Sequence, residues 1–74
     1  MFTPNQCKAA RNLLDWKQSD LAQRSGVGLA TIGTFETGLR VPFLRTLKDL
    51  EASFKEAGIE FENNDKICSV TLYK

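Results

Sequence analysis

The chain has no histidine, only two cysteines and no long apolar run. Cys7 and Cys68 lie near opposite ends, so they form neither a disulfide framework nor, without histidine, a metal-ligand set. We therefore expect a reduced, cytoplasmic setting with no metal and no cofactor. The opening stretch MFTPNQCKAARNLL is too polar for a signal peptide or a membrane span, so no membrane partner is expected.

Features of an enzyme are also missing. The sequence contains no glycine loop of the phosphate-cradling kind, and it has no histidine that could activate either cysteine. The carboxylates Asp15, Asp20 and Glu36 are better explained by helix surfaces and ion pairing. We predict a protein without enzymatic activity and without a small-molecule ligand.

Charge is distributed unevenly along the 74 residues, although the formal net charge is only +1. Up to Arg45 there are six basic and three acidic residues, whereas from Thr46 onward there are four lysines and six acids. The first part, at +3, suggests an anion-facing side, and the second, at −2, a side that points elsewhere. Chance explains so small a difference about equally well.

The spacing of apolar residues predicts four helices, over about residues 4–15, 18–24, 29–37 and 43–57. Thr3 and Pro4 suit the start of the first helix, and Trp16 should pack inward after it. Gly26 ends the second helix and Gly28 caps the third. The fourth carries an apolar stripe of Leu44, Leu47, Leu50, Ala52 and Phe54.

After Gly58 the apolar period changes from helical spacing to alternation. IEFE and CSVTLY each alternate, and the NNDK segment between them is rich in turn-forming residues. This pattern predicts a β-hairpin. An isolated two-stranded hairpin is marginal in water, so it packs on the last helix or pairs with a second chain.

Two short helices joined by a tight glycine turn form a helix-turn-helix. Ala22 permits a close crossing, Gly26 permits the turn, and Ile32 and Phe35 seat the second helix on the core. This geometry turns the outer face of residues 29–37 away from the domain, where the major groove of DNA can accept it.

These residues, QSDLAQRSGV, TIGTFETG, RVP and the pair Thr46-Leu47, resemble the lambda-repressor-like or Cro/C1-type (XRE) family over about residues 5–57. The tail resembles the short C-terminal extension of small bacterial members. The resemblance implies a mainly α fold, a four- to five-helix domain over 1–57 with a β-hairpin extension over 58–74. It also implies a transcriptional regulator of the repressor kind that binds a palindromic operator in the bacterial nucleoid as a homodimer.

The resemblance assigns roles to particular residues. Leu29, Ala30 and Thr34 occupy base-facing positions, with Thr31 nearby. Phosphate contacts fall to Lys17, Gln18, Thr37 and Arg40. Arg11 and Glu36 form a partly buried ion pair that joins the first and third helices.

The base-facing positions depart from the family pattern, because they lack the Gln, Arg, Asn or Ser side chains that often occupy them. None of the residues present makes the two-pronged hydrogen bond that identifies guanine or adenine. We therefore expect thymine-methyl contacts, single hydroxyl bonds and some readout of DNA shape. The uncharged face also leaves a second interpretation open, an antitoxin-like or other protein-interaction module.

A small domain with few phosphate contacts binds DNA weakly, so two copies on adjacent half-sites are expected. The acidic tail lies away from the basic part of the chain. We therefore expect Ile59, Phe61, Val70 and Leu72 at or near a homodimer interface. The alternative is that these residues cap the core of their own chain.

Overall fold

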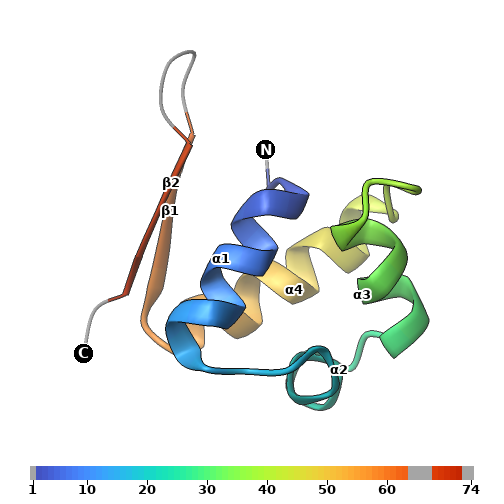
Figure 1. Ribbon diagram of the computed structural model, residues 1–74, viewed down its shortest axis with the longest axis horizontal. Helices are drawn as coiled ribbons and strands as arrows, with labels where there is room; N and C mark the ends of the chain where they lie inside the picture. Colours follow the sequence, from blue (N-terminus) through green and yellow to red (C-terminus); the bar gives the residue numbers. More distant parts are fainter. Residues whose placement is uncertain (1, 64–67, 73–74) are drawn as a thin grey trace.

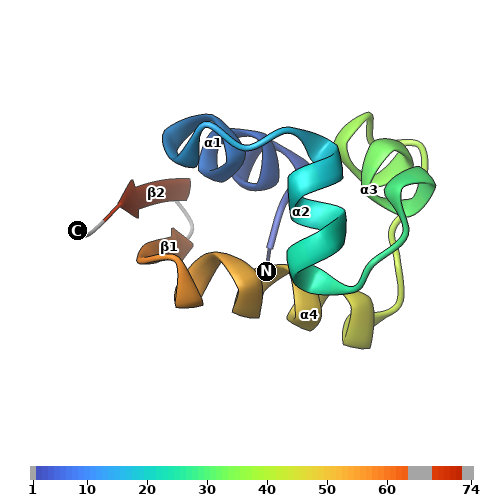
Figure 2. The same cartoon turned by 90° about the horizontal axis from the view of Figure 1, so that it is seen from below.

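The computed structural model describes residues 2–63 and 68–72, in which four helices precede one antiparallel hairpin. In chain order these elements are α1 (Pro4–Leu14), α2 (Gln18–Ser25), α3 (Leu29–Glu36), α4 (Leu44–Glu56), β1 (Ile59–Asn63) and β2 (Cys68–Leu72). In the hairpin Phe61 lies opposite Val70, and Ile59 opposite Leu72. The hairpin and α3 lie at opposite ends of the molecule (Figure 1; Figure 2). The predicted mainly helical fold with a C-terminal hairpin is confirmed, while residues 64–66 of its predicted turn lie outside the described residues.

Local chemistry sets the helix ends. At the start of α1, the hydroxyl of Thr3 accepts a bond from the Gln6 backbone N–H at 3.1 Å. In turn, the Gln6 side-chain oxygen accepts a bond from the Thr3 backbone N–H at 3.0 Å. The backbone N–H groups of both Thr3 and Gln6 therefore have acceptors. Gly26 ends α2 in the left-handed conformation with φ of 75°, and Gly28 caps α3 in an extended one. The predicted start and stop signals are therefore confirmed.

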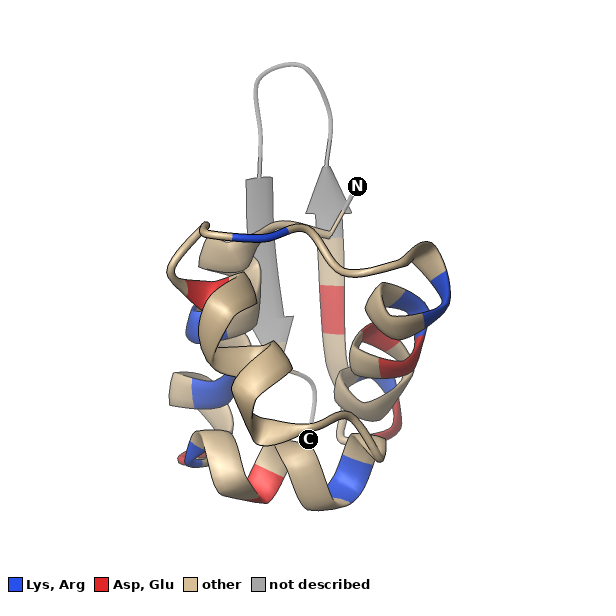
Figure 3. Cartoon of the chain, turned by 90° about the vertical axis from the view of Figure 1, so that its right-hand side faces the viewer, with Lys and Arg blue, Asp and Glu red and all other residues tan. Residues whose placement is uncertain are grey.

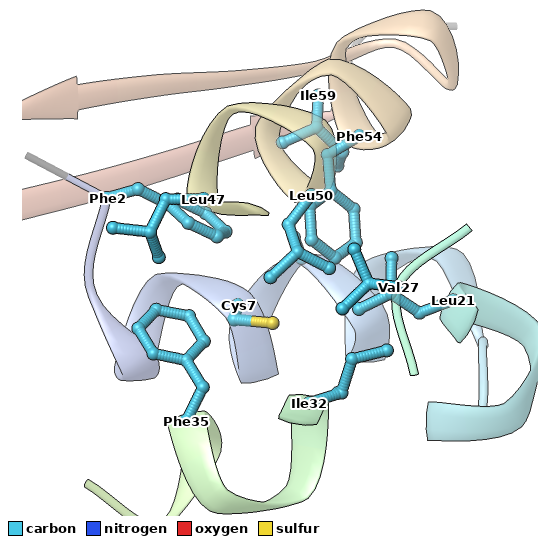
Figure 4. Close-up of a cluster of buried hydrophobic side chains, with 11 residues drawn as sticks. Phe2, Cys7, Leu21, Val27, Ile32, Phe35, Leu47, Leu50, Phe54 and Ile59 are labelled. Carbon is cyan, nitrogen blue, oxygen red and sulfur yellow. The ribbon is translucent and has the colours of Figure 1, made fainter. Parts of the chain in front are cut away.

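The core lies between the helices and receives side chains from all four. Figure 4 shows these apolar side chains pointing toward one another, with the Cys7 sulfur among them. The fully buried apolar residues of the four helices are Cys7, Ala10, Leu21, Ile32, Leu50 and Phe54. Trp16 packs against this cluster, and its ring stacks on Phe54 at a centroid distance of 5.7 Å, as predicted.

The hairpin contributes to the same core. Ile59 is 1% exposed, and Phe61 and Leu72 pack against the buried cluster. The Phe61 ring lies 4.9 Å from that of Phe2, in an edge-on arrangement. β1 contacts α4 and β2 contacts α1. Three of the four residues expected at a dimer interface therefore have partners within their own chain, and the side chain of Val70 lies outside the described set.

Two residues of the predicted α4 stripe are exposed, and that part of the prediction is wrong. Leu44 is 67% exposed, because it begins the helix beyond the reach of the core. Ala52 faces solvent, because the buried face instead runs through Leu47, Leu50, Ser53 and Phe54. In the described part of the chain, no helix combines the length and the apolar character needed to cross a bilayer.

Candidate nucleic-acid interface

The turn between α2 and α3 is held by Ser25 and Gly26. The Ser25 hydroxyl donates to the Leu21 carbonyl at 2.7 Å and accepts from the Val27 N–H at 3.1 Å. No atom lies within 4 Å of where a Gly26 Cβ would be, so glycine is required there for its positive φ alone. Val27 is buried immediately after the turn. The turn therefore fixes how α3 crosses α2.

This crossing leaves one face of α3 outside the core. Ile32 and Phe35 point inward, whereas Leu29 is 50% exposed and Ala30 faces solvent. Thr31 and Thr34 are half-buried beside them. Seen from the α3 side, basic and acidic segments both lie on the elements around this helix (Figure 3). The outer face of α3 itself carries no charged side chain, because Glu36 points inward.

The Thr34 and Thr37 hydroxyls on this side already have hydrogen-bond acceptors. Thr34 donates to the Thr31 carbonyl at 3.1 Å, and Thr37 donates to the Thr34 carbonyl at 3.0 Å. Methyl groups and hydroxyl lone pairs remain available to a ligand. At Thr34 and Thr37 the face therefore offers methyl groups and hydrogen-bond acceptors to a ligand.

A polar network lies beneath α3 and joins it to α1 and α2. Two Arg11 nitrogens donate to the two Glu36 carboxylate oxygens, each at 2.7 Å. Gln18 Nε2 donates to the same carboxylate at 3.1 Å, and Cys7 Sγ does so at 3.2 Å. The side chain of Glu36 is 2% exposed and that of Arg11 is 15% exposed. The ion pair expected between these helices is thus bidentate and nearly buried.

This network controls the ionisation of its members. Burial alone raises the pKa of Glu36, but the hydrogen bonds from Arg11, Gln18 and Cys7 outweigh it and hold that pKa below its usual value. Burial, followed by the neighbouring Glu36, raises the pKa of the Cys7 thiol well above its ordinary value. Cys7 is therefore a packed, protonated thiol rather than a nucleophile. Within residues 2–63 and 68–72, no three potential metal ligands gather.

The residues predicted to contact phosphate border α3 on two sides. Lys17 and Gln18 stand at the start of α2, and Gln18 Oε1 lies 3.8 Å from where a Gly33 Cβ would be. On the other side, the exposed Arg40 donates its backbone N–H to the Thr34 carbonyl at 3.4 Å. Thr37 is exposed at the end of α3. Gln18 Nε2 uses one of its two N–H groups for Glu36, so a phosphate contact by this side chain would use the other.

A groove of about 470 Å³ runs between α3 and the segment that leads into α4. It is lined mostly by apolar groups, from Ala30, Thr31, Thr34, Arg40, Val41, Pro42, Phe43 and Thr46. The sequence interpretation did not identify it. The sequence feature that could have indicated it is Phe43. This residue occupies the N-cap of α4, a position where Ser, Thr, Asp or Asn is usual.

The fixed turn and the outward face of α3 define a helix-turn-helix protein of the DNA-binding class. The chain belongs to the helix-turn-helix family of the Cro/C1 (XRE) type, since the family model HTH_3, described as helix-turn-helix, matches residues 8–58. A comparison with curated proteins gives no match.

Proposed function

We propose that this protein is a sequence-specific transcriptional regulator that inserts α3 into the major groove of double-stranded DNA. One observation carries the proposal. The outer face of α3 bears no charged side chain, while Lys17, before α2, and Arg40, after α3, stand on the segments that border it. The cations beside α3 can contact the DNA phosphates, and the uncharged outer face of α3 can contact the base edges in the major groove.

Readout through this face depends on shape and methyl contacts. Leu29, Ala30 and the Thr34 methyl are matched to thymine methyl groups, and Thr31 lies beside them. Lys17, Gln18, Thr37 and Arg40 hold the phosphates on either side and so fix the position of the helix. The preferred half-site is therefore rich in T at the contacted positions.

The protein acts as a homodimer on a palindromic operator and represses by occluding it. Two copies are needed because one copy offers few phosphate contacts, and affinity at physiological salt depends on their number. This role assigns the protein to the bacterial cytoplasm, associated with the nucleoid, and requires no small-molecule effector.

Selection of bound sequences from random double-stranded DNA tests the proposal. The expected result is a palindrome with T-rich half-sites. Thr34→Ala should alter the selected bases at one position, whereas Lys17→Ala should weaken binding to all sequences about equally. Failure of the wild-type chain to enrich any sequence would refute the proposal.

A second function is favoured by the exposed Leu29 and by the apolar groove beside α3. In that case the same face binds a protein, as in an antitoxin-like module. Salt separates the two functions, because binding to phosphates weakens steeply as salt rises, whereas binding to an apolar protein surface does not.

A further inference from the structure

The amide oxygen of Gln18 has no hydrogen-bond donor, although the nitrogen of the same amide is held in place. Gln18 Nε2 donates to Glu36 Oε1 at 3.1 Å, and Glu36 is itself bound by Arg11. Within residues 2–63 and 68–72, no group donates to Gln18 Oε1. Every buried polar side-chain atom in this part of the chain has a partner. Gln18 Oε1 is therefore a solvent-accessible acceptor that is not in use.

The bond to Glu36 fixes which end of the Gln18 amide is oxygen. A flipped amide would turn Oε1 toward the Glu36 carboxylate, so that two acceptors would face each other. The observed orientation keeps Nε2 on the carboxylate and leaves Oε1 free. A side chain held in advance also loses less freedom when it binds a ligand. The amide is therefore ready to accept a hydrogen bond in one defined direction.

This oxygen lies at the edge of the outer face of α3. Gln18 Oε1 is 3.8 Å from where a Gly33 Cβ would be, and no other described atom outside the adjoining α3 chain comes within 4 Å of that point. Gly33 lies one helical turn from Leu29 and from Thr37, which are both exposed. Because Gly33 has no side chain, nothing from this position covers the oxygen. The Gln18 amide therefore stands beside the residues proposed to contact bases.

The chemistry of a free acceptor excludes a phosphate as its partner. The phosphate oxygens of DNA accept hydrogen bonds, so they offer no proton to Gln18 Oε1. The donors in the major groove are the exocyclic amino groups, N6 of adenine and N4 of cytosine. Gln18 Oε1 therefore matches the amino group of a base.

The remaining N–H of Gln18 distinguishes between these two bases. One N–H of Nε2 is used by Glu36, which leaves one for DNA. Adenine places its N7 acceptor next to the N6 amino group, so an amide can bind it at two points. Cytosine has no acceptor beside N4 in the major groove. Adenine is therefore the base that matches both free groups of the amide.

We infer that Gln18 reads one adenine of the operator half-site from α2, through N6 and N7 of the base. Glu36 acts as a positioning residue, since it holds the amide that makes the contact. The inference rests on the proposed function and changes the role of one residue in it, from a phosphate contact to a base contact. It also supplies the two-pronged hydrogen bond that the outer face of α3 lacks.

Selection from random double-stranded DNA with wild type and with Gln18→Lys tests this inference. Lysine can still donate to Glu36 and to a phosphate, but it has no acceptor for an amino group. Wild type should select adenine at one position of the half-site, and Gln18→Lys should lose this preference or favour guanine, which lysine contacts. Lys17→Ala is the matched control, because it removes the adjacent cation and should leave the selected bases unchanged.

Altered adenines test the same contact with the wild-type chain. Purine lacks the N6 amino group, and 7-deazaadenine lacks the N7 acceptor. Each, placed at the selected adenine, should weaken wild-type binding about threefold or more in titrations. Gln18→Met has neither a strong donor nor an acceptor, so the same replacements should change its binding less than about twofold. Circular dichroism checks that both Gln18 variants fold, since Glu36 keeps its bonds from Arg11 and Cys7.

Three outcomes overturn the inference. The first is that wild type and Gln18→Lys select the same bases, because Gln18 would then contact a phosphate or no DNA at all. The second is that the base that depends on Gln18 is cytosine. The third is that wild type binds DNA with purine at the selected position as tightly as DNA with adenine. A wild-type chain that enriches no sequence refutes the proposed function as well, so the two failures are distinguishable.

Discussion

Glu36 is the one charged residue of α3, and its side chain points into the protein. It accepts from Arg11 on α1 and from Gln18 on α2, so a single carboxylate links three helices. Breaking a buried ion pair by removing one partner leaves the other uncompensated in a poorly solvated site. The orientation of α3 therefore depends on this residue.

Glu36→Gln should lower the free energy of unfolding by about 3 kcal/mol at pH 7, because it leaves the Arg11 charge unpaired. Urea unfolding followed by circular dichroism measures this change. The matched control is Glu51→Gln, which removes an exposed 3.5 Å contact with Lys55 on α4 and should cost less than about 0.5 kcal/mol. Equal losses in the two variants would mean that the network does not support the fold.

The same carboxylate should make stability dependent on acid. The folded-state pKa of Glu36 lies below its unfolded value, so its contribution is complete above that unfolded pKa of about 4.3. The contribution is lost as the pH falls through the folded pKa. Between pH 7 and pH 3, wild type should therefore lose more stability than Glu36→Gln, as urea titrations at each pH would show.

At the scale of single residues, the sequence could predict that Arg11 and Glu36 pair, because their spacing matches a known family. It could not predict that Cys7 and Gln18 join them. Their convergence depends on how closely three helices cross, and no periodicity along the chain reports that distance. Gln18 therefore donates a hydrogen bond to Glu36, and it also lies where a phosphate contact is expected.

At the scale of the element, replacing the two glycines Gly26 and Gly33 by alanine should change the stability of the helix-turn-helix in opposite directions. Gly26→Ala should destabilise by about 1 kcal/mol or more, because alanine resists the φ of 75° found there. Gly33 lies within α3, and a Cβ there meets only Gln18 Oε1, at an ordinary 3.8 Å. Gly33→Ala should therefore stabilise by about 0.5–1 kcal/mol through helix propensity. Thermal unfolding of both variants checks the pair, and equal signs would contradict the assigned backbone roles.

Helix and strand positions were predictable because periodicity and glycine stops agree along this chain. Which individual side chains are buried was harder to predict from the sequence. Leu44 continues the apolar spacing of α4, yet it is exposed because no other element covers the first turn. Periodicity shows which residues share a face, but only the packed fold shows where along a helix that face is covered.

The hairpin should behave as part of the helical core. Ile59 is 1% exposed against α4, so Ile59→Ala should cost about 2–4 kcal/mol in the free energy of unfolding. Glu60→Ala, on the exposed side of β1, serves as the control and should cost less than about 0.5 kcal/mol. Chemical denaturation measures both. A small loss at Ile59 would show that the helices fold independently of the tail.

At the scale of the whole molecule, a net charge of +1 conceals a basic region and an acidic one. Lys17 and Arg40, the cations proposed to contact phosphate, belong to the basic region, whereas the acidic region holds most of α4 and the hairpin. Composition locates these charges along the chain. It could not show that an apolar groove adjoins α3, since that depends on how the segment between α3 and α4 crosses the end of α3.

Arg40 provides a measurement that counts copies on DNA. Each lost phosphate contact makes the slope of log K against log salt shallower by about 0.9. A monomer carries one Arg40 and a dimer two, so Arg40→Ala should change the slope by about 1.8 if two copies bind one site. Binding titrations with the selected DNA at several salt concentrations supply these slopes. Lys55→Ala, at the end of α4 and paired with Glu51, should leave the slope unchanged. A change near 0.9 would indicate one bound copy, and no change would remove Arg40 from the interface.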